Sequence, residues 1–326
     1  MTGSSFLRSR RQLLLAVLVG ASVGAQAQSW PERPVRLVVP YAPGAAADQL
    51  ARTVGVRLSA SLGQPVVIDN RAGAGGTLGA DNVAKSPPDG YSIVLGNDAT
   101  HALNYFFIKK FPYDPVKSFT PIVPVATNHI VLVVHPSLPV KNVAELIAYA
   151  KSNPGKLSFG SSGSGTAHHL AGELLNVKAG IKMLHVPYKG GGPAMSDLLG
   201  NTIPVLFASL AAAKPHMDSG KVRALGVFEG KRLPTMPNLP AIAETLPGYA
   251  IESGFGFFGP AGLPDAITTR LNTEINKALS APDLRASLEA AGMSATGGTP
   301  QDLLIQQRES MNQAEALIKA AGIEPQ

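Results

Sequence analysis

Short apolar runs alternate with longer amphipathic segments along most of the chain after Trp30. Four of the runs are rich in valine, isoleucine and leucine, and they occupy residues 35–39, 65–68, 92–95 and 130–134. Continuous apolar character over so few residues is typical of strands that are buried on both faces, as in parallel sheets. The pattern therefore predicts β-strands at these four places.

The segments between the runs have the spacing of amphipathic helices. Leu50, Val54 and Leu58 recur at i, i+4 and i+8, and residues 143–150 carry an apolar face at i, i+3, i+4 and i+7. Further strands are expected at 183–186, 203–207 and 222–227, with a short helix at 194–199. Strands that alternate with helices indicate the α/β class. After residue 258 the pattern becomes mainly helical.

The first 27 residues have the pattern of a secretory signal peptide. Arg8, Arg10 and Arg11 precede an apolar run at 13–24, and Ala25-Gln26-Ala27 is a small-x-small cleavage signature. A bilayer-spanning helix needs roughly 20 apolar residues, so this run is too short to remain as an anchor. We expect a periplasmic mature protein that begins at Gln28.

The route of export has two interpretations. Residues 9–14 resemble a twin-arginine signal in which Leu13 replaces the usual phenylalanine, and an ordinary signal with adjacent arginines fits equally well. The chain has no cysteine, which excludes disulfides, thiolate metal sites and a cysteine nucleophile. A cysteine-free chain is compatible with an oxidising compartment.

The net charge of the whole chain suggests a nucleic-acid partner, but its distribution along the chain argues against one. The formal charge of the 326 residues is +6, but the three arginines of the signal carry half of it and leave +3 on the other 299 residues. The mature part has no Lys/Arg run of the kind that tracks phosphates. Its length allows two domains. We expect a soluble globular protein that does not bind nucleic acid.

Four loops follow predicted strands, and most of them open a helix. They are residues 41–48, 70–77, 160–169 and 186–192. In open α/β sheets ligands gather at the carboxyl ends of strands, where helix N-termini offer free N–H groups and partial positive charge. These loops are therefore the candidate ligand site.

Catalytic and cofactor motifs fail in these loops. Gly73, Gly75 and Gly79 come close to a dinucleotide fingerprint, but Leu78 stands where the third glycine is required. Neither Ser162 nor Ser164 has the glycines of a nucleophile elbow. Hydroxyls and backbone N–H groups at a helix N-terminus are better suited to cradling an anion.

Other combinations of side chains remain as alternatives. Ser164, His169 and Asp197 could form a hydrolase triad, and His169 with Glu173 could bind a metal, although further ligands have no obvious source. Asp48 has two possible roles, capping the helix that follows it or binding a ligand amine, and capping is favoured. We expect no metal and no cofactor.

Six segments in one order resemble a known family. They are Trp30-Pro31-x-Arg33-Pro34, Pro43-Gly44…Asp48, Asn70-Arg71-x-Gly73-Ala74-Gly75-Gly76, Gly163-x-Gly165-Thr166-x-x-His169-Leu170, Val186-Pro187-Tyr188-Lys189-Gly190 and Lys221-Val222-Arg223-Ala224-Leu225. Together they resemble the Bug family of extracytoplasmic solute receptors, the binding components of tripartite tricarboxylate transporters. The resemblance runs from about residue 30 to the C-terminus.

The resemblance implies an α/β, two-domain periplasmic-binding-protein (Venus-flytrap) fold that closes on one small carboxylate in a cleft between the domains. In that family the chain crosses between domains twice. Mapped here, residues 28–127 and 230–326 form one domain and residues 128–229 form the other.

The resemblance also implies which residues bind the ligand. From the first domain these are Tyr41, Gly44, Ala45, Ala46, Ala47, Asp48 and Thr100, and from the second Ser162, Ser164, Gly165, Thr166, His169, Tyr188, Gly190 and Ser209. No arginine is needed, because two opposed helix N-termini already favour negative charge.

Two departures from the family pattern bear on the ligand. Ala47 stands where relatives usually carry serine or threonine, and Ala208 and Ser209 stand where relatives often place Asp or Asn. The carboxylate best suited to receive an ammonium group is therefore missing. We expect a mono- or dicarboxylate with an apolar or aromatic body rather than an amino acid.

The predicted function is that of a monomeric periplasmic solute-binding protein without catalytic activity. It would deliver a small carboxylate to a tripartite tricarboxylate transporter or present it to a sensor. Two alternatives remain open: an exported oxidoreductase that binds a nucleotide cofactor at Gly73–Gly79, and a periplasmic serine esterase that uses Ser164 and His169.

Overall fold

The computed structural model of the chain describes residues 30–251 and 253–321. The predicted signal peptide, 1–27, lies outside the described residues. The chain divides into two units, residues 1–32 and 33–326. Of the first unit only residues 30–32 are described, and all the described helices and strands lie in the second.

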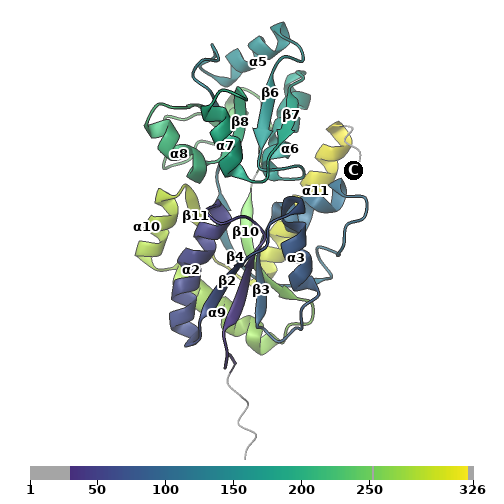
Figure 1. Cartoon of the computed structure of the whole chain (residues 1–326), viewed down its shortest axis with the longest axis vertical. Coiled ribbons are helices and arrows are strands. Elements are labelled where there is room, and N and C mark those ends of the chain that lie inside the picture. Colours follow the sequence, from purple (N-terminus) through teal and green to yellow (C-terminus); the bar gives the residue numbers. More distant parts are fainter. Residues whose placement is uncertain (1–29, 252, 322–326) are drawn as a thin grey trace, which may run out of the picture. The chain divides into compact units, whose positions relative to one another are not determined.

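A six-stranded mixed sheet forms the lower half of the second unit in Figure 1. Its strand order is β11 (Met293–Ala295), β4 (Phe119–Asn128), β10 (Gly254–Pro260), β3 (Ser92–Asn97), β1 (Val35–Val39) and β2 (Val66–Asn70). β1 pairs in parallel with β2 and β3, whereas β10 is antiparallel to both of its neighbours.

Helices connect and cover the strands of this first sheet. They are α2 (Ala46–Leu62), α3 (Thr77–Ala84), the π-helical turn η2 (Ala99–Leu103), α4 (Asn104–Phe107), α9 (Asp265–Leu279), α10 (Pro282–Ala290) and α11 (Pro300–Ala321). Leu50, Val54 and Leu58 of α2 are fully buried, as the spacing predicted.

A five-stranded sheet forms the upper half in Figure 1. Its order is β7 (Leu184–Pro187), β6 (Ser158–Ser161), β8 (Val205–Ser209), β5 (Ile130–Val134) and β9 (Arg223–Val227). The accompanying helices are α5 (Val143–Ser152), α6 (Ala167–Ala179), α7 (Gly191–Leu199) and α8 (Leu210–Asp218).

The expectation of a parallel strand is wrong at β5. All five of its residues are buried, but it runs antiparallel to both β8 and β9. Ile130, Leu132 and Val134 enter one hydrophobic cluster, and Val131 and Val133 enter another. Continuous apolar character therefore reports two buried faces and not the direction of pairing.

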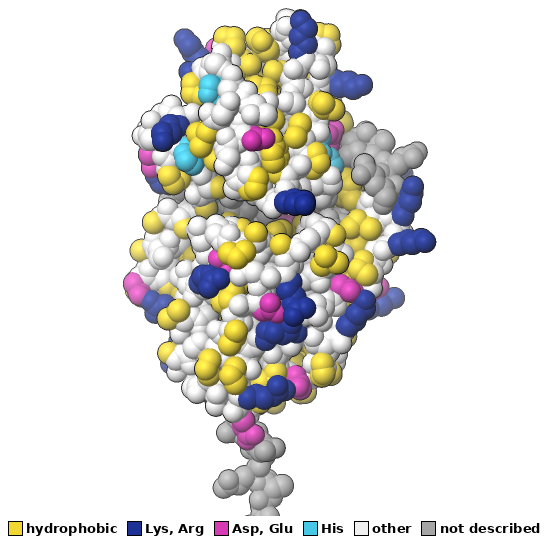
Figure 2. Space-filling view, in the orientation of Figure 1, with side chains coloured by type: hydrophobic (Ala, Val, Ile, Leu, Met, Phe, Trp, Pro, Cys, Tyr) yellow, Lys and Arg dark blue, Asp and Glu magenta, His cyan; other side chains and the backbone are white. Residues whose placement is uncertain are grey.

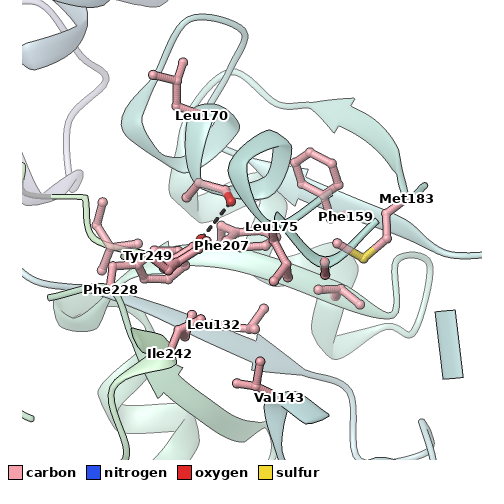
Figure 3. Close-up of a cluster of buried hydrophobic side chains, with 14 of the residues drawn as sticks. Leu132, Val143, Phe159, Leu170, Leu175, Met183, Phe207, Phe228, Ile242 and Tyr249 are labelled. Atoms are coloured by element: carbon pink, nitrogen blue, oxygen red, sulfur yellow. Dashed lines mark hydrogen bonds between the residues drawn. The ribbon is translucent and has the colours of Figure 1, made fainter. Parts of the chain in front are cut away.

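The larger of these clusters lies beside the second sheet and draws in residues from distant parts of the chain (Figure 3). Phe159, Phe207 and Phe228 are fully buried, and Tyr249 packs against Phe228 with 5.5 Å between ring centroids. The Tyr249 hydroxyl donates to the carbonyl oxygen of Ala171 over 2.7 Å, so the one polar atom of this ring is satisfied. The segment that follows β9 is thereby held against α6.

The chain passes twice between the two sheets. His129 alone separates β4 of the first sheet from β5 of the second, and residues 228–253 lead back from β9 to β10. Each sheet is thus built from its own parts of the chain. After β10, helices α9, α10 and α11 pack against strands of the first sheet, and α11 also contacts α6 beside the second.

Three strands lie where the sequence pattern gave no strand signal. β4 contains Pro121 and Pro124, which cannot donate to a ladder, and its pairing with β10 shifts register near both. β10 carries glycines within its aromatic run, and β11 is three residues long in a region expected to be helical. No helix within residues 30–251 and 253–321 has the length and apolar character needed to cross a bilayer.

Candidate functional site

Four helices begin around one cavity of about 160 Å³. The residue that precedes the first turn of each helix lines this cavity: Ala45 of α2, Thr166 of α6, Gly190 of α7 and Ser209 of α8. We call it the inner cavity. α2 comes from the first sheet and the other three helices from the second, so the N–H ends of helices from both sheets converge here.

The full lining of the inner cavity is Tyr41, Gly44, Ala45, Ala46, Ala47, Gln49, Asn97, Asn128, Ser162, Thr166, Ala167, His168, Gly190, Gly191, Gly192, Ser209, Ala211, Ala212, Ser253 and Phe255. This set contains no Lys, Arg, Asp or Glu. Of the four helices only α6 has a side-chain cap, from Thr166, whose hydroxyl accepts from the amide of His169. Attraction for an anion here comes from helix ends rather than charged side chains.

A second, larger cavity of about 570 Å³ shares Tyr41, Ser162 and Gly190 with the inner one. We call it the outer cavity. It is lined by the loop 72–76, by Ser164, His169 and Tyr188, and by the exposed Lys189. Figure 2 shows a hollow between the two halves of the molecule, with Lys and Arg scattered over this face among acidic groups.

Tyr41 stands where the two cavities meet. Its hydroxyl donates to Oδ1 of Asn97 over 2.9 Å. Burial raises the pKa of Tyr41 well above its ordinary value, so the phenol stays neutral. The first loop therefore gives the site a neutral aromatic wall and an ordered Asn97, a residue that the sequence analysis did not single out.

Asp48 lines neither cavity, and its carboxylate is fully engaged. It accepts from the amide of Gly44 over 2.9 Å, from Asn70 Nδ2 over 3.0 Å and from Arg52 Nε over 3.0 Å. Burial acts to raise the pKa of Asp48, but these hydrogen bonds, led by that from Arg52, hold it below its ordinary value. The favoured capping role is wrong in its detail, because α2 has no side-chain cap: Asp48 bonds the amide of Gly44, before the N-cap residue Ala45, and so fixes the loop that leads into the helix.

Thr100 is fully buried and also lines neither cavity. Its Oγ1 accepts from the amide of Asn97 over 3.0 Å, at the end of β3. Thr100 thus supports Asn97, and Asn97 is the residue of this segment that reaches the cavity.

Ser162 and His168 face the inner cavity from the second sheet, with Ser162 Oγ 2.7 Å from His168 Nδ1. Ser162 lies just after β6 and His168 in the first turn of α6. His168 is only 9% exposed, and burial lowers its pKa to about 4. At neutral pH the imidazole is therefore uncharged.

Gly165 lines neither cavity. It lies in the loop before α6, where this loop comes close to Asn104 on the first sheet's side. A Cβ at this position would lie 2.2 Å from Oδ1 of Asn104, which follows β3, and φ of Gly165 is +74°. Asn104 is itself held by Gly75 and Thr77, whose oxygens accept from its Nδ2 over 3.1 Å. The absence of a side chain at Gly165 lets these loops meet.

The hydrolase triad does not assemble. Asp197 accepts from the Tyr188 hydroxyl over 2.6 Å, and Nδ1 of His169 accepts from the amide of Gly165 over 3.2 Å. The ring of His169 stacks on His185 at 3.9 Å. Glu173 is 3.8 Å from His169, but the described residues contain no group of three or more His, Cys, Asp or Glu that could hold a metal ion.

Sequence reasoning missed several residues of the inner cavity: Asn97, Asn128, His168, Ser253 and Phe255. Asn128 is the most informative, because its Oδ1 is buried and finds no partner among the described residues. It ends β4, a strand that the sequence pattern did not reveal. Only the pairing of distant segments brings these side chains to the site.

Comparison with known proteins gives a consistent result. The family model "Tripartite tricarboxylate transporter family receptor" matches residues 50–323. A relative from Pseudomonas sp. (strain P51), the UPF0065 protein in the tcbD-tcbE intergenic region, is 41% identical over 300 residues, which are 90% of this chain and 89% of that protein.

Two solved structures extend the similarity to the fold. "R. palustris Rpa4515 with adipate" is 39% identical with a TM-score of 0.88, and the match covers 91% of this chain and 100% of that one. The periplasmic binding protein BugD is 34% identical with a TM-score of 0.85 over the same shares of the two chains. The chain belongs to the tripartite tricarboxylate transporter receptor family, the Bug family that its motifs resemble, and it is accordingly a two-domain solute-binding receptor and not an enzyme.

Proposed function

We propose that this receptor works in the periplasm and captures a small carboxylate in the inner cavity, for uptake by a tripartite tricarboxylate transporter or for presentation to a sensor. One observation carries the proposal: four helix N-termini line a single cavity that has no charged side chain. Helix N-termini attract anions through free N–H groups and the helix dipole. The related Rpa4515 structure, described with adipate, is consistent with this chemistry.

Residues from both sheets contribute to the proposed contacts. Backbone groups of 44–47 would hold a carboxylate from the first sheet's side. From the second sheet's side, the hydroxyl of Ser209 and backbone groups at Ser162, Thr166 and Gly190 would complete the shell. Tyr188, Ser164 and His169 line the outer cavity, so we assign them to the entrance. Asp48, Thr100 and Gly165 would act by shaping these loops.

The proposed domain boundaries follow the two passages between the sheets. Residues 28–127 and 230–326 would form one domain and residues 128–229 the other, with the ligand enclosed when the domains close. Consistent with this division, β4 and β10 belong to the first sheet, and β5 and β9 to the second.

The lining favours a ligand with an apolar or aromatic body. The lining includes Ala45, Ala46 and Ala47, and Tyr41 and Phe255 add two aromatic rings. An amino-acid ligand would bring an ammonium group into a cavity that has no carboxylate to receive it, and a buried unpaired charge is costly. Glutamate and aspartate should therefore bind poorly.

Export and partners complete the proposal. The signal peptide at 1–27, of the ordinary or the twin-arginine type, would direct a monomer to the periplasm, where it would meet the membrane subunits of the transporter. The N-terminal sequence of the exported protein tests the signal peptide, because cleavage after Ala27 would leave Gln28 as the first residue.

A thermal-shift panel of organic acids tests the binding function. A carboxylate present at 100 times its Kd should raise the free energy of unfolding by about 2.7 kcal/mol. Calorimetry should rank mono- or dicarboxylates with apolar bodies above glutamate and aspartate. No shift with any carboxylate would overturn the function, and glutamate or aspartate as the tightest ligand would overturn the inferred preference.

A substitution that places a negative charge in the inner cavity tests whether the ligand binds there. Ala46→Asp adds a carboxylate at the first turn of α2, where it suits the helix dipole but repels a ligand anion. Binding should be lost while the fold is kept. Val56→Asp, at a 73% exposed position of the same helix, is the matched control and should bind normally.

A further inference from the structure

A serine and a histidine that line the inner cavity lie within hydrogen-bond distance of each other. Ser162 Oγ lies 2.7 Å from Nδ1 of His168, and both residues line the cavity. Within the described part of the chain, Nε2 of His168 has no hydrogen-bond partner, and this atom is not fully buried. His168 is only 9% exposed and lines the inner cavity, so we infer that Nε2 faces this cavity.

Either group of this pair can be the donor, because a neutral imidazole has two tautomers. We infer that the Ser162 hydroxyl donates to Nδ1, which places the single proton of the ring on Nε2. Burial keeps the pKa of His168 near 4, so the ring carries one proton, not two, at neutral pH. His168 then offers the cavity a fixed, neutral N–H donor.

His168 and the N-terminus of α2 line the same cavity but belong to different halves of the fold. His168 belongs to α6 on the second sheet's side, whereas 44–47 belong to the loop and helix on the first sheet's side, and all of them line one cavity. A carboxylate held at α2 leaves the opposite end of the ligand toward His168.

We propose that His168 is a specificity-determining residue that selects dicarboxylates over monocarboxylates by donating from Nε2 to the second carboxylate. This inference rests on the proposed carboxylate-binding function and narrows it. A neutral donor suits the site, because the N-termini of α6, α7 and α8 already supply positive potential at this end. A monocarboxylate of equal length would leave the N–H without an acceptor, which costs affinity.

The test compares two ligands of one chain length in several variants. The ligands are the tightest dicarboxylate in the series from succinate to sebacate and the monocarboxylate with the same number of carbons. A hydrogen bond to a charged group corresponds to about 10- to 100-fold in Kd. His168→Phe should weaken the dicarboxylate by that factor and leave the monocarboxylate within about threefold.

Two further variants separate the donor from the volume of the ring. His168→Gln keeps an N–H at similar reach and should hold dicarboxylate affinity close to the wild-type value. Ser162→Ala removes the hydroxyl that fixes the ring, and it should weaken the dicarboxylate selectively; it serves as the test if His168→Phe does not fold. His135→Phe is the control, since His135 forms a similar pair with Ser137 (2.7 Å) beyond the other end of β5.

The outcomes distinguish the two claims. If the wild-type protein binds no carboxylate, the proposed function fails and this inference fails with it. If the wild type binds carboxylates but does not prefer the dicarboxylate, or if His168→Phe weakens both ligands equally, only the assignment of His168 is overturned.

Discussion

Nδ1 of His129 lies 2.6 Å from Oε1 of Glu229, and this contact joins the two passages of the chain between its sheets. His129 separates β4 from β5, and Glu229 follows β9 by two residues. Nε2 of His129 is also 2.9 Å from Oγ of Ser294 in β11. One side chain thus ties both crossing segments to the edge of the first sheet.

Loss of this contact should lower stability. Glu229→Ala leaves Nδ1 of the largely buried His129 without its partner, and an unsatisfied buried polar group costs about 1–3 kcal/mol. Urea denaturation at pH 7 should show that decrease in the free energy of unfolding. Glu229→Gln can keep one hydrogen bond and should lose less.

Glu289→Ala, at an exposed position of α10, is the comparison for a carboxylate that does not bridge the crossings, and it should be nearly neutral. An unfolding free energy for Glu229→Ala equal to that of Glu289→Ala would contradict the bridging role.

Local sequence signals predicted the elements that depend on local periodicity. α2, α5, β1 and β3 lie where the apolar spacing placed them, because burial of one helix face or of a short apolar run follows directly from that spacing. β4 was not predicted, because its prolines weaken the strand signal. Its position is determined by pairing with β10 and β11, which lie more than a hundred residues away in the sequence.

The same division applies to the candidate site. Three of its four helix starts follow loops that the sequence identified, since glycine, serine and threonine after a strand mark a strand-to-helix turn. Asn97, Asn128 and His168 gave no comparable signal. Their importance depends on which strands are neighbours, and periodicity carries no information about that.

Acid should destabilise this protein more steeply than its carboxylates alone would. Burial lowers the pKa of His101 and His185 to about 3 and that of His168 and His169 to about 4. Between those values and the ordinary 6.5, the unfolded chain binds more protons than the folded one. The stability that depends on these neutral histidines is therefore fully present above about pH 6.5. As the pH falls below that value, each histidine lowers the free energy of unfolding by up to about 1.4 kcal/mol per pH unit.

His101→Phe isolates one of these contributions. The ring of His101 stacks on Phe258 at 3.7 Å, so phenylalanine keeps the packing and removes the titration. Thermal unfolding between pH 4 and 7 should show a shallower dependence in the variant. Asp98, whose pKa burial raises, changes stability in the opposite direction, but it is common to both proteins and cancels in the comparison. Parallel curves for the two proteins would refute the role of His101.

The hydroxyl of Tyr249 should stabilise the fold without affecting the ligand. Tyr249→Phe removes its hydrogen bond to the Ala171 carbonyl and leaves the ring packed against Phe228 (Figure 3). The free energy of unfolding should fall by about 1–2 kcal/mol, because a buried hydrogen bond is lost. Denaturant unfolding measures the loss, and calorimetry should give an unchanged Kd. A changed Kd at equal stability would mean that this segment acts on the site.

The close approach of the loop at Gly165 to Asn104 should be required for tight binding of the ligand. Gly165→Ala adds a methyl group 2.2 Å from Oδ1 of Asn104, so the loop before α6 and the turn after β3 could no longer approach as they do here. We expect the Kd for a carboxylate ligand to rise about tenfold or more, which corresponds to roughly 1.4 kcal/mol of binding free energy.

Gly180→Ala is the matched control for the backbone strain in that variant. Gly180 also has a positive φ, +61°, and a Cβ there would meet no atom within 4 Å. Both substitutions carry the cost of an alanine in the left-handed region, about 1 kcal/mol in stability, but only the one at Gly165 creates the contact with Asn104. The double variant Gly165→Ala with Asn104→Ala should regain part of the affinity, since the obstructing amide is removed. Equal Kd values for the Gly165 and Gly180 variants would show that the approach of these loops does not contribute to binding.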